Sequence, residues 1–182
     1  RWELGGGTNA MLSDTVGFIR RLPHHLVASF RSTLEETIHC QLILIILDAS
    51  DPSALSQLET VEETLIEIGA QHQPRLLVLN KIDLLGSPSD KLVCVSRYPD
   101  AIQISSVSGE GIETLISEVH GVVIGDVREV VITLPSRASK AVDFIEKRAE
   151  VLHRDWKDDR SIFTIRIGRN QIEQLLSRER DV

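Results

Sequence analysis

The sequence is poor in aromatic residues and cysteine, and it contains no long apolar run. Aromatic residues make up 4% of the 182 residues and hydrophobic residues 42%, so a core must consist mainly of Leu, Ile and Val. Cys40 and Cys94 have neither metal-ligand spacing nor a disulfide framework, and we expect both to be small buried hydrophobes. The longest apolar run, Leu42 to Leu47, is far shorter than the ~20 residues of a membrane-spanning helix. Since no targeting signal is recognisable, we expect a cytoplasmic protein without a membrane span.

Basic residues are scarce in the first two thirds of the chain. Residues 1–125 carry 8 basic and 16 acidic side chains, a net charge of −8, whereas residues 126–182 carry 12 basic and 11 acidic, a net charge of +1. An acidic surface repels nucleic-acid phosphates, so we expect no direct DNA binding. A local patch could still contact a ribonucleoprotein. The six histidines share no metal-ligand spacing.

Short apolar strands alternate with amphipathic helices through residue 125. A glycine-rich hairpin is predicted at 1–13 and a helix from Leu26 to Ile38, followed by strands at 42–47, 75–79 and 101–104. The helix between the first two of these strands is expected to start at Asp51, with Asp51 as its N-cap. This alternation predicts an α/β fold with a doubly wound parallel sheet.

The pattern restarts at residue 126. A strand is predicted at 130–132, then a helix that buries Ala141, Ile145, Ala149 and Leu152, a strand at 162–167 and a helical tail at 171–180. We therefore predict two domains, a partial nucleotide-binding domain at 1–125 and a small α+β domain at 126–182.

A motif that we interpret as guanine-reading follows the predicted strand at 75–79. In Asn80-Lys81-Ile82-Asp83, the Asp83 carboxylate can accept two parallel hydrogen bonds from the guanine ring N–H and exocyclic amine, a pair that adenine does not offer. Asn80 can tie neighbouring loops together, and the stem of Lys81 can lie over the ring. The plainer interpretation is a strand that ends in a polar turn. The partner motifs at the ends of other strands favour the nucleotide.

Two further loops fit the same ligand. Ser105 and Ser106 follow the predicted strand at 101–104, where a backbone N–H would donate to guanine O6. The plainer interpretation is a serine-capped helix start, and the two can be true together. In Asp14-Thr15-Val16-Gly17, Asp14 would hold a water on Mg²⁺ and the Gly17 N–H would contact the terminal phosphate. D-x-x-G alone is often only a turn. Phe18 occupies the place of a water-orienting Gln and cannot polarise water, so we assign no catalytic residue.

These motifs, taken in order, resemble the HflX GTPases over nearly the whole chain. The segments that carry the resemblance are Asp14 to Arg20, Leu22-Pro23-His24, Ser32 to Thr37, Asp48 to Pro52 and Asn80 to Asp83. The resemblance implies a P-loop GTPase-type domain that binds GTP or GDP with Mg²⁺. It also implies association with the large ribosomal subunit and rescue of stalled ribosomes by the intact protein.

The resemblance is incomplete on the phosphate side. The sequence contains no G-x-x-x-x-G-K-[ST] phosphate loop, and it lacks the switch threonine and the N-terminal domain of HflX proteins. The family's residues therefore carry over only to Asp14, Gly17, Asn80, Lys81, Asp83, Ser105 and Ser106. Two interpretations stay open. The chain is either part of a GTPase and inactive alone, or a non-catalytic remnant or interaction module with little or no GTP binding.

Overall fold

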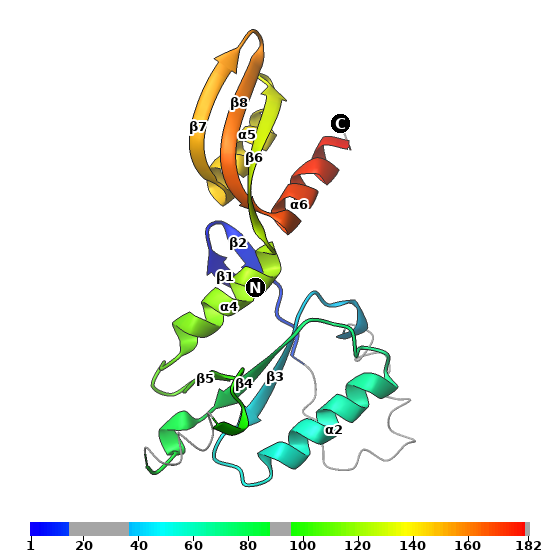
Figure 1. Cartoon of the computed structure of the whole chain (residues 1–182), viewed down its shortest axis with the longest axis vertical. Coiled ribbons are helices and arrows are strands. Elements are labelled where there is room, and N and C mark those ends of the chain that lie inside the picture. Colours follow the sequence, from blue (N-terminus) through cyan, green and yellow to red (C-terminus); the bar gives the residue numbers. More distant parts are fainter. Residues whose placement is uncertain (15–36, 88–95, 181–182) are drawn as a thin grey trace. The chain divides into compact units, whose positions relative to one another are not determined.

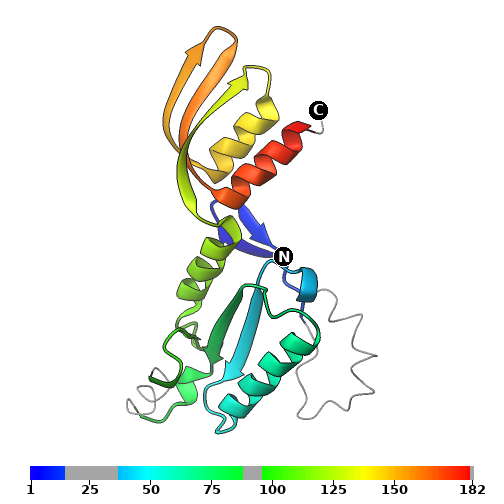
Figure 2. The same ribbon diagram turned by 45° about the vertical axis from the view of Figure 1, so that its right-hand side comes forward.

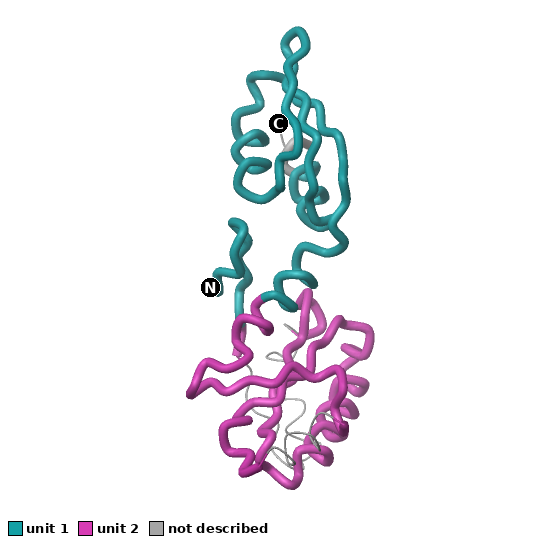
Figure 3. The backbone as a smooth tube through the Cα atoms, turned by 60° about the vertical axis from the view of Figure 1, so that its left-hand side comes forward, with its two compact units in different colours: residues 1–12, 117–182 teal, residues 13–116 magenta. Residues whose placement is uncertain are grey.

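The computed structural model describes residues 1–14, 37–87 and 96–180, and these form three sheets (Figure 1). By compactness the chain divides into two units, residues 13–116 and residues 1–12 with 117–182 (Figure 3). Helix α4 (Ile112–Ile124) contributes residues to both units. The predicted domain boundary at residues 125/126 remains a prediction.

The unit of residues 13–116 is built on a parallel sheet. Strands β3 (Ile43–Asp48), β4 (Arg75–Asn80) and β5 (Ile102–Gln103) lie in that order, each parallel to its neighbour. Helix α2 (Ala54–Glu67) connects β3 to β4 and lies along the sheet (Figure 2). A parallel pair needs such a crossover, and both faces of its strands become apolar. The expected α/β class is confirmed.

The core of this unit explains why the strand predictions succeed. Its buried residues come from strands β3 and β4, helix α2 and the segments that follow them: Ile45, Leu47, Val61, Leu65, Ala70, Leu79 and Tyr98.

The start of α2 differs from the prediction, because its N-cap is Ser53 rather than Asp51. The Asp51 carboxylate accepts from the Ser53 N–H and from Gln57, so it braces the turn before the helix. The predicted helix from Leu26 lies largely outside the described residues.

The second unit contains an antiparallel sheet with two helices. Its elements are β6 (Val127–Pro135), α5 (Ser139–Arg148), β7 (Glu150–Lys157), β8 (Arg160–Gly168) and α6 (Arg169–Arg180), and the strand order is β6-β8-β7. Alternate residues of β8 (Phe163, Ile165 and Ile167) are buried against Phe144 and Ile145 of α5. The expected α+β arrangement after residue 126 is confirmed.

Strand β7 corrects the prediction of a helix that continues to Leu152. Helix α5 ends at Arg148, and Ala149 already has extended backbone. Leu152 lies in β7 and is 40% exposed, so its three-residue spacing from Ala149 does not reflect a helix. Every residue of β7 is exposed, and the pairing register shifts between Val151 and His153. An exposed edge strand with a bulge shows no regular alternation, which is why the pattern does not reveal it.

The glycine-rich hairpin forms a two-stranded sheet of its own. Strands β1 (Trp2–Gly5) and β2 (Thr8–Ala10) are antiparallel, with Trp2 opposite Ala10. The hairpin belongs to the same unit as the C-terminal sheet. The buried Gln171 side chain donates to Thr8 Oγ1 at 3.3 Å, and Arg148 Nε donates to the Gly7 carbonyl at 3.3 Å. Residues far apart in sequence thus hold the hairpin in place.

Two remaining expectations concern a membrane span and the two cysteines. Among the described residues, no helix combines the length and apolar character needed to cross a membrane. Cys40 is half-buried rather than fully buried, and desolvation raises the pKa of its thiol. Cys94 lies outside the described residues.

Candidate functional site

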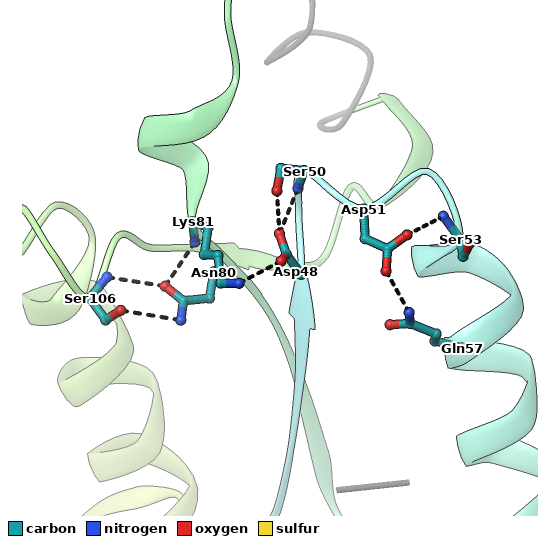
Figure 4. A network of polar contacts seen from close by, with 8 residues as sticks. All are labelled: Asp48, Ser50, Asp51, Ser53, Gln57, Asn80, Lys81 and Ser106. Atoms are coloured by element: carbon teal, nitrogen blue, oxygen red, sulfur yellow. Dashed lines mark hydrogen bonds and ion pairs between the residues drawn. The ribbon is translucent and has the colours of Figure 1, made fainter. Parts of the chain in front are cut away.

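Asn80 joins two loops at the carboxyl end of the parallel sheet. Its side-chain oxygen accepts the Ser106 N–H at 3.0 Å and the Lys81 N–H at 2.8 Å (Figure 4). Its Nδ2 donates to Ser106 Oγ at 3.3 Å. One amide therefore connects the end of β4 to the loop after β5, because Asn80 and Ser106 are 26 residues apart in sequence. The sequence prediction that Asn80 ties neighbouring loops is matched by this geometry.

Ser105 anchors the second loop from inside the protein. It has no exposed surface, its N–H donates to the Glu110 carbonyl at 2.9 Å, and its carbonyl accepts the Gly109 N–H at 2.9 Å. Its hydroxyl accepts the Ser108 N–H at 3.1 Å. Buried polar groups need such partners, and here they close the loop on itself. Ser105 therefore stabilises the conformation of the loop, and Ser106 makes the loop's contacts with Asn80.

Gly111 closes this loop against strand β5. Its φ of +77° lies in the left-handed region, and a methyl group there would overlap the carbonyl oxygen of Gln103. Only glycine combines that backbone conformation with so close an approach. The path of the Ser105–Ser106 loop is thus fixed at both ends.

Lys81 has a defined partner in this structure. Its ammonium Nζ donates to Asp48 Oδ2 at 2.6 Å, and Asp48 Oδ1 accepts the Ser50 N–H and hydroxyl at 2.9 and 2.6 Å. Hydrogen bonds from Lys81 and Ser50 lower the pKa of Asp48. The bond to Asp48 raises the pKa of Lys81. The sequence assigns no partner to Asp48, so its contact with Lys81 is a finding of the structure.

Asp83 is exposed and follows a buried residue, Ile82. Lys81 has a φ of +66°, and after this left-handed residue the chain enters the short 3₁₀ helix η1 (Ile82–Leu84). Ile82 is 3% exposed, whereas Asp83 is exposed. The backbone therefore places Ile82 in the core and the Asp83 carboxylate at the surface of the same loop. A surface carboxylate can accept hydrogen bonds from a planar base.

The phosphate-side residues are not assembled in the described part of the chain. Asp14 is exposed, and no described hydrogen bond connects it to Asn80, Lys81 or Asp83. Gly17 and Phe18 lie outside the described residues. No group of three or more His, Cys, Asp or Glu side chains that could hold a metal occurs among the residues the structure describes. Within the described residues, the loops after β4 and β5 are joined, and no group that could hold Mg²⁺ is assembled.

A shallow cavity of about 380 Å³ lies beside these loops without including them. Its lining comes from the β3–α2 connection and the first residues of α2, from Leu84 to Gly86 at the end of η1, and from Arg97 and Tyr98. Neither Asn80 nor Lys81 nor Asp83 contributes to its wall. We therefore place the candidate site on the loops and not in this cavity.

Comparison with known proteins identifies relatives for this arrangement. Residues 92–180 match the family model of the HflX C-terminal domain. A GTPase HflX of Gluconacetobacter diazotrophicus is 38% identical over 86% of this chain and 34% of its own length. A GTPase HflX of Spirochaeta thermophila is 39% identical over 84% of this chain and 37% of its own length. Among solved structures, the crystal structure of SsGBP mutation variant G235S covers 59% of this chain and 40% of that chain, at 30% identity and a TM-score of 0.48.

The match is extensive for this chain and partial for its relatives. The chain spans about one third of the length of these two curated relatives. The family model covers the Ser105–Ser106 loop and residues 117–180 of the unit that contains the antiparallel sheet. The resemblance inferred from the motifs is therefore confirmed, and the chain is a relative of the HflX GTPases that carries their C-terminal domain.

Proposed function

We propose that this chain contributes the base-reading side of a guanine-nucleotide site. The observation that supports the proposal is the pair of contacts between Asn80 and Ser106, which joins the two predicted base loops at the carboxyl ends of β4 and β5. Ligands of open parallel sheets bind at this end of the strands. The named GTPase activity of the relatives points to the same ligand.

Each proposed contact has a defined chemical role. The Asp83 carboxylate accepts from the guanine ring N–H and amine, and the aliphatic stem of Lys81 covers one face of the ring. The Ser106 N–H already donates to Asn80. Guanine O6 must therefore take another backbone N–H of this loop, or the Asn80 bond must open. Ser105 supports the loop from the core and does not contact the base.

The phosphates and Mg²⁺ are a separate part of the proposal. We propose that Asp14 and Gly17 contribute on that side, as the family motif implies, with Mg²⁺ supplying charge neutralisation when bound. We also propose GTP hydrolysis, binding of the large ribosomal subunit and rescue of stalled ribosomes in the cytoplasm as activities of an intact HflX-type protein. Family likeness supports these steps. No described residue of this chain is assigned a catalytic role.

A second candidate function is an interaction module without useful nucleotide affinity. The observation that favours it is the absence of a G-x-x-x-x-G-K-[ST] motif from these 182 residues. Such a loop and its Lys supply most of the charge-assisted contacts to nucleotide phosphates. On either interpretation, we propose residues 1–125 as the partial nucleotide-binding domain and residues 126–182 as the small α+β domain.

The test of the base site is a change of base preference. Asp83→Asn converts one acceptor oxygen into an amide donor, which matches the O2 of xanthine instead of the guanine amine. We expect the variant to bind XDP better than GDP, and the unaltered chain to show the reverse. Shifts of amide NMR signals during titration with each nucleotide, up to millimolar concentration, measure both affinities.

The control is Asp100→Asn, which makes the same charge change at an exposed position outside the two loops. It should leave the preference for GDP unchanged. An unaltered preference in the Asp83 variant would contradict the assignment of the base loop. Absence of any shift with either nucleotide would favour the interaction module.

A further inference from the structure

The two oxygens of the Asp48 carboxylate have different partners. Oδ1 accepts both the N–H and the hydroxyl of Ser50, two residues ahead, which closes a turn at the end of β3. Oδ2 accepts Lys81 Nζ at 2.6 Å (Figure 4). Because Ser50 fixes one oxygen, the carboxylate cannot rotate freely. The second oxygen is thereby aimed at the lysine.

The backbone places this carboxylate on rigid structure. Asp48 stands opposite Asn80 in the parallel register of β3 and β4, and the Ala49 N–H donates to the Asn80 carbonyl at 2.8 Å. Lys81 follows directly with its left-handed backbone. The side chain of Asp48 is 29% exposed and that of Lys81 is 50% exposed. The acceptor is thus the better-held partner, and the ion pair orders the lysine more than the aspartate.

An ordered lysine is useful to a planar ligand. The four-carbon stem of a free lysine samples many rotamers, and binding that requires one of them carries an entropy cost. A lysine already fixed at its ammonium presents its stem without that cost. We propose that Asp48 is a positioning residue that holds Lys81 across the base loop before a guanine nucleotide binds. The inference rests on the proposed function and adds to it a residue that does not touch the nucleotide.

Asp48→Asn separates the two roles of the carboxylate, which are to accept from Ser50 and to accept from Lys81. The amide oxygen of Asn can still accept from Ser50, whereas its NH₂ group replaces the oxygen that accepts from Lys81. We expect the Lys81 ammonium to become more mobile in the nucleotide-free variant and GDP to bind about two- to fivefold more weakly, the range of a partly exposed ion pair. Asp48→Glu, which keeps the negative charge, should recover part of the affinity.

The experiment follows Lys81 and GDP in the same 182-residue samples. NMR relaxation of the Lys81 side chain measures its order without nucleotide, and titration with GDP measures affinity. Glu67→Gln on α2 removes the same charge at an exposed position and should change neither quantity. Unchanged Lys81 order in Asp48→Asn would overturn the inference. So would lost order with unchanged GDP affinity.

Failure of the proposed function gives a different result. If the unaltered chain shows no GDP binding at millimolar concentration, the nucleotide assignment is wrong and the positioning role falls with it. If the unaltered chain binds GDP and Asp48→Asn binds it equally well, only the role of Asp48 is wrong. A weaker GDP complex together with a mobile Lys81 supports both.

Discussion

Replacing Gly111 by alanine should destabilise the parallel-sheet unit through a close backbone approach. Gly111 has a φ of +77°, and an added methyl group would overlap the Gln103 carbonyl oxygen. Left-handed backbone costs a non-glycine residue about 1–2 kcal/mol. Forcing atoms into filled space costs about 1–3 kcal/mol more. We therefore expect Gly111→Ala to lose about 2–5 kcal/mol of the free energy of unfolding.

Gly109 provides a matched control in the same loop. Its φ is +83°, but nothing lies within 4 Å of an added methyl group, so Gly109→Ala should lose only the backbone term of about 1–2 kcal/mol. Hydrogen exchange of the Ile104 amide, which donates to the Leu79 carbonyl at 2.8 Å, reports on the stability of this sheet. Equal losses in the two variants would refute the argument that the Gln103 carbonyl excludes a side chain.

Two further results are expected. Because the chain contains no phosphate-loop motif, GTP should bind several kcal/mol more weakly than to a site with a complete loop, at about 1.5–3 kcal/mol for each missing charge-assisted bond; micromolar binding by isothermal titration calorimetry would contradict this. The Asp48–Lys81 contact lowers the pKa of the Asp48 carboxyl. Its contribution to the free energy of unfolding should therefore be complete above the pKa of Asp in the unfolded chain, about 4, and be lost as the pH falls through the lower pKa of the folded chain. A carboxyl-carbon NMR titration measures that pKa. Lys81→Met should raise it, and an identical titration in that variant would exclude the ion pair.

The sequence predicts the parallel sheet well because each signal is local. The apolar run at Leu42 to Leu47 needs no partner to be recognised, and the structure places β3 at Ile43–Asp48. The same holds for Arg75–Asn80 and for α6 at Arg169–Arg180. Buried strands and amphipathic helices carry their pattern in consecutive residues.

The sequence does not predict features that depend on distant contacts. Every residue of β7 lies at the surface, and its pairing with β8 is what makes it a strand. A turn signal was present, since Asp158 in the connection to β8 has a φ of +54° and aspartate tolerates that region. Asp48 and Lys81 are 33 residues apart, and their contact follows from the register of β3 against β4. Spacing along one segment cannot reveal such a register.

The bond between Gln171 and Thr8 has a consequence for folding during synthesis. Its partners are 163 residues apart, and the unit they hold together is interrupted in sequence by residues 13–116. Contacts of such separation form slowly, because a long loop must close before they contribute. The parallel-sheet unit can form as soon as its own residues leave the ribosome. The β1–β2 hairpin, although it precedes the parallel-sheet unit in sequence, must wait for α6 before it gains its buried partner.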